Sequence, residues 1–491
     1  MKSVPVFFIS SFALFILLLP VSLSIKFMQN DDWNRYVSVI RLLFGNFELL
    51  PVTATTFYTQ GLLGMMYTSI FPLTTLPVLT LFVAILCFYV TGLISFKFYK
   101  QTELNSLLFG LLLFLNPIFI YSVWGFMTEI YLLFFVLLSI YFASAKLSLK
   151  FNGAWILGFF AKQSAVIVPL GVVASQMISR KYKSAIINFT ILCLILAFYL
   201  FIFPRTSEMT GQKSIKLQNL SSMKYIFSNL FASVVYLAMF LVPITFKKIK
   251  ILNSVSVLIS SAIFSYLLYW LFNLTNFPWK MFPHYPNTFT AFGFFHQGIS
   301  GNPSGFDYSY ILNLFSIISF YLLVIFFMYN LNWKFIKRFA VSFELYSLLF
   351  GIFLIIVNPF VFDRYFLVLI PLAMFLFLRL SDYKINPKMI MIFILLEGFI
   401  SLDFSLEFIS RQNKIWELGN YASEKFDVDK NLIRADHAWN SFHNVNLNDY
   451  EYQILFGDAA CKSCNNLIIG PFESGKFLTK SKIVLIKNEK L

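Results

Sequence analysis

The sequence predicts an all-α polytopic membrane protein of about thirteen transmembrane helices, followed by a small α/β domain at the C-terminus. The chain has 491 residues, of which 58% are hydrophobic and 12% are charged, and its mean hydropathy is +0.74. Soluble domains contain roughly 45–50% apolar and about 25% charged residues, so this composition favours a membrane protein. Apolar runs of about eighteen residues or more recur along the chain, and each is long enough to cross a bilayer.

Small clusters of Lys and Arg lie between the apolar runs and predict the orientation of the chain. Basic residues favour cytoplasmic loops, so the clusters place the N-terminus in the cytoplasm and residues 409–491 outside. The first run, Val4 to Ile25, has no clear cleavage site and is interpreted as a retained span. The clusters contain Lys97 and Lys100, Lys146 and Lys150, Arg180 to Lys183, Lys247 to Lys250, Lys334 to Arg338, and Arg379 to Lys388.

This path predicts two domains in a multi-pass protein of the plasma (inner) membrane. Residues 1–408 form the transmembrane domain, and residues 409–491 form the extracytoplasmic one. The net charge of +15 is spread over many small clusters without a continuous basic face, so nucleic acid is not an expected partner. Membrane lipids are expected partners.

Residues 153–177 do not fit simple alternation, because basic clusters predicted to be cytoplasmic flank them on both sides. A segment of 25 residues cannot span about 30 Å twice at about 1.5 Å per residue. We therefore expect two short helices that meet at Lys162 and Gln163, partway through the bilayer. Broken helices of this kind are tolerated where protein or a water-filled cavity surrounds them.

The tail has a different character from the rest of the chain. A helical pattern near 412–426 precedes two strand-like runs, NLIIG and KIVLIK, which predict a small α/β domain. The tail also contains the pair CKSC, Cys461 and Cys464. A structural zinc site needs about four ligands, so this pair favours a local disulfide in an oxidising compartment.

Charged residues at the ends and breaks of apolar runs are candidates for function, because charge at membrane depth is costly. The predicted path brings four such positions to the outer face, and each has a structural alternative. A lone aspartate can be a solvated interfacial residue, Glu129 can cap a helix, and Asp363 with Arg364 can form a structural ion pair. Lys162 has no adjacent acid and needs an anionic partner. The four positions are Asp31 with Asp32, Glu129, Lys162, and Asp363 with Arg364.

The order of these motifs resembles the GT-C superfamily of membrane glycosyltransferases. The motifs are DDW after the first span, an NP followed by MTE, an apolar run interrupted by KQ, and DRYFLVLIP. The chain is most similar to the branch that contains the protein O-mannosyltransferases and the lipid A aminoarabinose transferase. The resemblance covers about residues 1–380, and these short motifs are specific for the superfamily but not below it.

The resemblance implies that a sugar is transferred, with inversion, from a polyprenyl-phosphate carrier to an acceptor. It assigns Asp32, with Asp31 as the neighbouring candidate, to the acid near the acceptor, and Glu129 to the second external acid. It assigns Lys162 and Arg364 to the donor phosphate. Further substrate contacts are assigned to Asp363, Tyr365 and Gln163, and Glu48 is the nearest candidate for an extra acid that the branch often has after its first motif.

The loop 276–308 is rich in aromatic residues, Gly and Pro. Sugar faces stack on aromatic rings, so Trp279, Tyr285 and His296 are candidate substrate contacts, although an interfacial aromatic belt explains the same composition. His284 is a candidate partner of an acid in binding a divalent metal ion, but no metal site is predicted from it alone.

The predicted function is therefore transfer of a sugar from a polyprenyl-phosphate donor to a glycan, lipid or protein acceptor at the outer face. An inverting transfer needs a carboxylate base and cations that stabilise the departing phosphate. Neither GxxxxGK[ST] nor GxGxxG occurs, so no nucleotide cofactor is expected. A transporter or flippase of lipid-linked saccharides and a polysaccharide polymerase or ligase remain alternatives.

Overall fold

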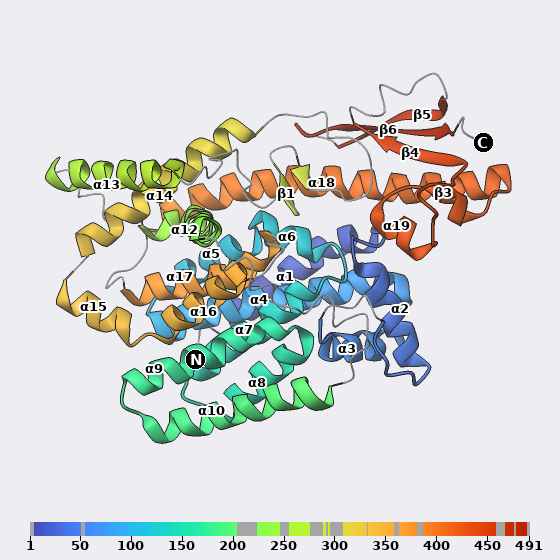
Figure 1. The fold of residues 1–491 in the computed structure, drawn as a ribbon. Coiled ribbons are helices and arrows are strands. Elements are labelled where there is room, and N and C mark those ends of the chain that lie inside the picture. The colour runs from blue at the N-terminus through green and yellow to red at the C-terminus, as the bar shows by residue number, and fades with distance from the viewer. Residues whose placement is uncertain are drawn as a thin grey trace.

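The computed structural model of this chain is mostly helical, with a small sheet near the C-terminus (Figure 1). It describes residues 4–50, 55–203, 223–245, 255–274, 288–290, 293–294, 308–330, 332–357, 363–380, 386–457, 467–475 and 478–488. The helices of the first half are α1 (Val4–Leu23), α2 (Asp32–Leu43), α3 (Tyr58–Thr68), α4 (Leu76–Tyr99), α5 (Glu103–Phe114), α6 (Pro117–Val123), α7 (Thr128–Ser144), α8 (Ser148–Ala161), α9 (Ile167–Ile178) and α10 (Tyr182–Ala197).

Polar caps and prolines fix the ends of several helices. The Thr102 side chain accepts from the Asn105 amide at the start of α5, and Asn116 caps α6 in the same way ahead of Pro117. The helices of the second half are α12 (Met223–Thr245), α13 (Val255–Leu274), α14 (Ser309–Asn330), α15 (Trp333–Ala340), α16 (Phe343–Val357), α17 (Leu369–Leu380), α18 (Pro387–Phe426) and α19 (His437–Phe442).

Five helices in the described residues are long and apolar enough to cross a membrane, and up to seven spans result if each of two bent pairs counts as one. Large apolar side chains on α1, α10 and α18 face outward, among them Phe8, Leu194 and Leu395. A soluble protein rarely exposes so much apolar surface, which a bilayer would cover. The five helical stretches are Pro5–Leu23, Leu73–Tyr99, Tyr182–Ile202, Tyr310–Met328 and Pro387–Phe426, and the bent pairs are α5 with α6 and α15 with α16.

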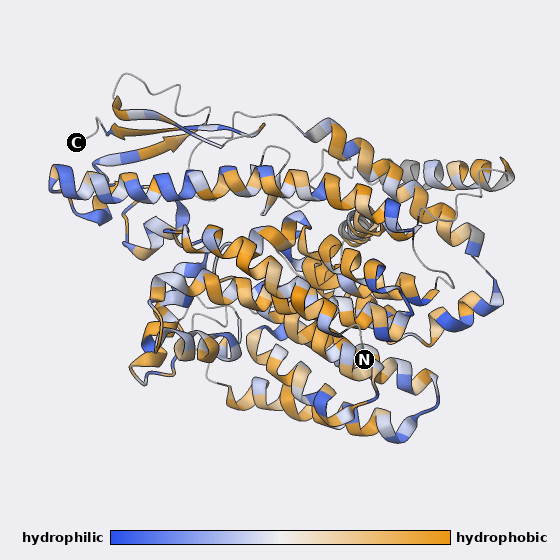
Figure 2. Ribbon diagram, turned by 180° about the vertical axis from the view of Figure 1, so that it is seen from behind, coloured by the Kyte–Doolittle hydropathy of each residue, from blue (hydrophilic) through white to orange (hydrophobic). Residues whose placement is uncertain are grey.

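The two ends of the helical bundle differ. The helices α2, α3 and α19 lie at one end with the C-terminal sheet, whereas α15 and the connection from α9 to α10 lie at the other (Figure 1). Hydrophobic residues dominate the bundle between them, and hydrophilic residues gather on the half of α18 that adjoins the sheet (Figure 2). The DDW motif and the C-terminal tail therefore share one end of the molecule, and the basic clusters at 180–183 and 334–338 share the other.

The segment 153–177 is broken where the sequence predicts. The helix α8 ends at Ala161, a 3-10 turn covers Gln163–Val166, and α9 continues from Ile167. Lys162 lies between them in an extended conformation. This confirms the prediction of two short helices that meet at Lys162 and Gln163.

The predicted domain boundary at 408/409 falls inside one continuous helix. The 40-residue helix α18 runs from Pro387 to Phe426, so the helical pattern predicted near 412–426 is confirmed and forms the second half of a longer helix. Hydropathy falls in the second half of α18, but no proline interrupts it, and polar residues continue at helical spacing. The first half of α18 packs on α5 and α6, and the second half packs on the sheet.

The C-terminal sheet has four strands in the order β3-β4-β6-β5, with β3 parallel to β4 and the other neighbours antiparallel. Its two longest strands contain KIVLIK and the LIIG part of NLIIG, so this part of the prediction is confirmed. A separate two-stranded pair is formed by β1 (Phe289–Thr290) and β2 (Gly293–Phe294). The strands of the sheet are β3 (Ile433–Arg434), β4 (Tyr452–Phe456), β5 (Leu467–Ser474) and β6 (Ser481–Lys487).

A stripe of buried polar residues attaches the sheet to α18. Asp403 accepts hydrogen bonds from the Thr479 amide and hydroxyl, at 3.1 and 2.7 Å. Glu407 accepts from the hydroxyls of Ser474 and Ser481. Arg411 lies 3.3 Å from Glu407 and donates to the carbonyl of Phe294. We call Asp403, Glu407 and Arg411, which recur every fourth residue on one face of α18, the α18 stripe.

Candidate functional site

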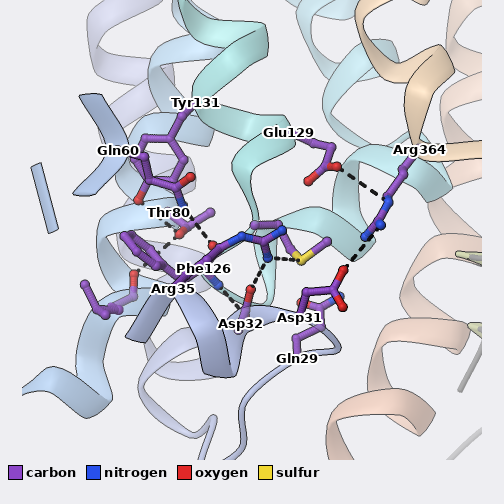
Figure 3. Close-up of polar contacts among 12 residues, drawn as sticks. Gln29, Asp31, Asp32, Arg35, Gln60, Thr80, Phe126, Glu129, Tyr131 and Arg364 are labelled. Carbon is purple, nitrogen blue, oxygen red and sulfur yellow. Dashed lines mark hydrogen bonds and ion pairs between the residues drawn. The ribbon is translucent and has the colours of Figure 1, made fainter. Parts of the chain in front are cut away.

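Five titratable side chains from distant parts of the sequence form a connected chain of contacts. Lys162 Nζ lies 2.9 Å from Glu129 Oε1, and Arg364 Nε lies 3.6 Å from the same oxygen. Arg364 Nη2 also lies 3.4 Å from Asp31 Oδ2, and His437 Nε2 lies 3.5 Å from Asp31 Oδ1. Figure 3 shows Arg364 between the two carboxylates. We call these five residues the site cluster, and their contacts confirm the predicted convergence of the four charged positions.

The break in the α8–α9 hairpin positions Lys162. The last carbonyl groups of a helix lack partners within it, and here the start of α3 and the residues just before it supply donors to them. The Phe57 amide donates to the Ala161 carbonyl at 3.2 Å, and the Thr56 and Thr59 hydroxyls donate to two earlier carbonyls of α8. These hydrogen bonds satisfy the carbonyl groups at the end of α8. Lys162 therefore lies between the two helices, and its side chain contacts Glu129.

Glu129 holds two cations instead of capping its helix. It stands in the first turn of α7, but no side-chain hydrogen bond caps that helix start in the described part of the chain. Its side chain is 3% exposed, and Oε1 contacts both Lys162 and Arg364. Its other oxygen is buried without a hydrogen-bond partner among the described residues. The sequence alternative of a helix cap is therefore wrong.

Asp32 is fully buried and engaged on both oxygens. Oδ1 accepts from Arg35 at 2.8 Å, and Oδ2 accepts from the Phe126 amide at 2.6 Å. The approach depends on Gly125, because a Cβ built there would lie 2.4 Å from the Asp32 oxygen. Asp32 thus joins the start of α2 to the loop before α7 (Figure 3).

Asp31 is the more accessible of the two aspartates. Its side chain is 33% exposed, against 1% for that of Asp32. Burial acts to raise the pKa of Asp31, but the contact with His437 and the charges of Arg364 and Arg35 hold that pKa below its ordinary value. Burial raises the pKa of Asp32 to about 6, although Arg35 and the Phe126 amide favour its ionised form. Asp31 is therefore the stronger candidate for an ionised group that meets a ligand.

Asp363 has a structural role in this arrangement. Its Oδ2 accepts from the amides of Thr288 and Phe289 at 3.1 and 2.8 Å, and its Oδ1 accepts from the Arg364 amide at 2.7 Å. The guanidinium of Arg364 points instead to Glu129 and Asp31. The alternative of an Asp363–Arg364 ion pair is therefore wrong, and Asp363 positions the backbone that carries Arg364.

The remaining predicted site residues lie partly beside the site cluster, partly away from it and partly outside the described residues. The Tyr365 ring centroid lies 5.0 Å from Lys162 Nζ, so this ring borders the site cluster. Gln163 donates to the Tyr199 hydroxyl at 3.1 Å. Glu48 is exposed beside Arg41, 3.6 Å away, and is outside the site cluster. The following predicted residues lie outside the described ones: Trp279, His284, Tyr285, His296, Cys461 and Cys464.

Two residues of the site are missing from the sequence prediction. Arg35 follows Asp32 by three residues, a spacing that brings side chains together on a helix and gave a usable signal. His437 comes from α19, which packs on α2, and nothing in the local sequence indicates this contact. Asp436 fixes the start of α19, accepting from the Trp439 amide at 2.6 Å and from the Trp416 indole at 3.1 Å.

A divalent metal ion needs several carboxylate, imidazole or thiolate ligands at one point. In the part of the chain that the structure describes, no group of three or more His, Cys, Asp or Glu side chains is arranged to hold one. The site cluster is better described as carboxylates that alternate with basic side chains.

Comparison with known proteins gives no match. No protein-family model, no curated protein and no solved structure matches this chain. The resemblance to membrane glycosyltransferases thus rests on the sequence motifs alone.

Proposed function

We propose that this chain is an integral-membrane glycosyltransferase that moves a sugar from a polyprenyl-phosphate donor to an acceptor. The observation that carries the proposal is Arg364, which links an accessible carboxylate, Asp31, to a second cation, Lys162, through Glu129. A base and two cations in one connected cluster meet the two needs of an inverting transfer from a phosphate leaving group.

In this proposal Asp31 accepts the proton of the acceptor hydroxyl. The hydroxyl oxygen forms a bond to the anomeric carbon of the sugar, and the bond from that carbon to the phosphate oxygen breaks with inversion. The electron pair leaves with polyprenyl phosphate, whose new negative charge Lys162 and Arg364 stabilise. The accessible position of Asp31 supports its assignment as the base in preference to Asp32.

Glu129 has a second task in this scheme. It is buried, accepts from Lys162 and forms an ion pair with Arg364 at 3.6 Å, so it keeps the two cations side by side when no phosphate is present. A donor phosphate that approaches the two cations would compete with this carboxylate. Glu129 thereby prepares the phosphate site and limits the affinity for other anions.

We also propose the finer topology predicted from the sequence: about thirteen helices of GT-C type, a cytoplasmic N-terminus and an extracytoplasmic C-terminal domain. It is supported by the placement of the basic clusters at 180–183 and 334–338 at one end of the bundle and of α2 and α19, which carry Asp31 at the start of α2 and His437, at the other (Figure 1). In this orientation the site meets a lipid-borne donor from the bilayer and an acceptor from the outer face.

Mass spectrometry of lipid carriers and glycans tests this function. Cells that lack the protein should accumulate one polyprenyl-phosphate sugar, and one glycan, lipid or protein should lose the same sugar. Purified protein should then release polyprenyl phosphate from that donor only when the acceptor is present. Movement of the donor across reconstituted vesicles without release of polyprenyl phosphate would overturn the proposal in favour of a transporter.

A further inference from the structure

A cleft of about 850 Å³ lies between the end of α1, the second half of α18 and strand β5. Its volume is in the range of roughly 300–1,000 Å³ that is typical of small-molecule sites. One face of α18 forms its floor and carries Asn413, Glu417, Asn420, Tyr421 and Glu424. The successive spacings of four, three, one and three residues align these side chains along the helix.

The floor of the cleft is rigid at one end and open at the other. Asn413 is fixed by two backbone groups, since it accepts from the Lys26 amide at 2.8 Å and donates to the Ser24 carbonyl at 2.9 Å. Lys414 is held over the Phe472 ring, 4.1 Å from its centroid. Tyr421 is 41% exposed and offers its ring to a ligand.

The charges that line the cleft balance one another. Two lysines, Lys26 and Lys414, are matched by two glutamates, Glu417 and Glu424, and Lys414 lies 3.3 Å from Glu417. A phosphate or other anion that reached the lysines would also meet the glutamates. The chemistry therefore favours a neutral ligand rich in hydroxyl groups, which amides and carboxylates bind by hydrogen bonds and an aromatic ring binds by its face.

The cleft is structurally linked to the site cluster. Trp416, which also lines the cleft, donates its indole N–H to Asp436 at 3.1 Å. Asp436 is followed by His437, which contacts Asp31. The Trp416 indole and the start of α19 therefore connect one wall of the cleft to the carboxylate that we assign to the acceptor hydroxyl.

We infer that this cleft binds the acceptor as a neutral saccharide chain and delivers its end to Asp31. The inference rests on the proposed function, because the transfer reaction is what requires an acceptor there. It narrows the acceptor from a glycan, lipid or protein to a glycan or to the glycan part of a larger molecule.

Calorimetric titration of the full-length protein in detergent tests the inference without any donor. The probes are mannotetraose, N-acetylchitotetraose and the acidic tetragalacturonate. At least one neutral tetrasaccharide should bind, and the acidic one should bind at least about tenfold more weakly. Tyr421→Ala should weaken the neutral complex by about tenfold or more, and Glu417→Gln should weaken it by a smaller factor. Lys425→Ala, on the same helix outside the cleft, should leave it unchanged.

The outcomes separate this inference from the proposed function. Asp31→Asn should keep saccharide binding while it loses transfer. Failure of all three probes to bind, or equal affinity in wild type and Tyr421→Ala, would overturn the saccharide cleft even if transfer is observed. Tyr421-dependent binding of vesicles that contain anionic lipid, with no saccharide binding, would overturn it in favour of a lipid headgroup. Saccharide binding without any transfer would instead contradict the proposed function.

Discussion

The site cluster and the α18 stripe are both groups of charged residues buried in an apolar protein, but they differ in how their charges are satisfied. In the α18 stripe, Asp403 and Glu407 accept from backbone amides and hydroxyls of the C-terminal strands and loops, and Arg411 is fully buried. In the site cluster, Asp31 is 33% exposed and its partners are two titratable side chains from distant segments.

This difference separates charges that hold the fold from charges that meet a ligand in the proposed function. Backbone and hydroxyl donors are specific to one folded arrangement, so the α18 stripe attaches the sheet to its helix. Cations that share one carboxylate side chain can exchange it for the anion of a ligand, so the site cluster is suited to binding and chemistry. Variants of the two groups should therefore change different properties.

The largest effect is expected from Asp31→Asn. If Asp31 is the base, the variant loses its proton acceptor and transfer should fall by about 10²–10⁴-fold. The unfolding temperature should stay near that of wild type, because Asp31 is partly solvated. The measurement is release of polyprenyl phosphate by purified protein, together with a thermal scan.

Asp32→Asn is the matched variant. Both oxygens of Asp32 are engaged and buried, so this change should lower the free energy of unfolding by about 1–3 kcal/mol. Full activity of Asp31→Asn, with activity lost in a stable Asp32→Asn protein, would return the role of base to Asp32.

Arg411→Met should have the largest effect on stability. It leaves Glu407 buried without its ion-pair partner, which costs about 3–5 kcal/mol. Transfer per folded molecule should be unchanged. Thermal unfolding in detergent measures the loss, and the double variant with Glu407→Gln should recover part of it. A stable Arg411→Met protein would show that the α18 stripe does not hold the sheet in place.

The sequence was sufficient to predict much of the site, because the number of crossings determines which loops share a face. Asp31, Glu129, Lys162 and Arg364 follow from that reasoning. The choice between Asp31 and Asp32 does not, since one residue on a helix turns the side chain by about 100° and neither neighbour is distinguished by its type. His437 lies more than 400 positions from Asp31, so its contact depends on the fold of the whole tail.

The fold shows a similar limit at residue 409. Falling hydropathy predicts the end of a domain near this residue. A helix nevertheless continues where its backbone hydrogen bonds are satisfied and one of its faces can still be buried. Asp403, Glu407 and Arg411 supply that buried face with polar side chains that bind the sheet. Hydropathy alone does not register partners of this kind.

A smaller effect is expected from Lys162→Gln. Glutamine keeps the length and polarity of the side chain but removes its charge, so the donor KM should rise about ten- to hundredfold. The acceptor KM should change by less than about threefold. Lys181→Gln, an exposed residue at the other end of the bundle, is the control. Equal changes in the KM values of donor and acceptor would argue against contact with the phosphate.

The smallest effect concerns the two ends of α19, where His437 touches Asp31 and His443 packs against Trp439 with ring centroids 4.3 Å apart. Burial, with a smaller contribution from Lys430, lowers the pKa of His443 to about 4 from its ordinary 6.5. Between these values the unfolded chain binds the proton more tightly, so acidification from pH 6.5 to pH 4 destabilises the fold. His443 is partly exposed, so we expect wild type to lose only about 1–2 kcal/mol relative to His443→Gln over this window. Burial raises the pKa values of Asp32 and Asp436 to about 6, so acidification stabilises the fold through these two groups. This contribution is the same in wild type and in His443→Gln. The measurement is the free energy of unfolding against pH for the two proteins, and parallel curves would show that His443 is not kept neutral by the fold.

His437→Gln should instead reduce transfer while the stability of the sheet is kept. The histidine that starts α19 and the histidine that follows its last residue therefore repeat the contrast between site and fold.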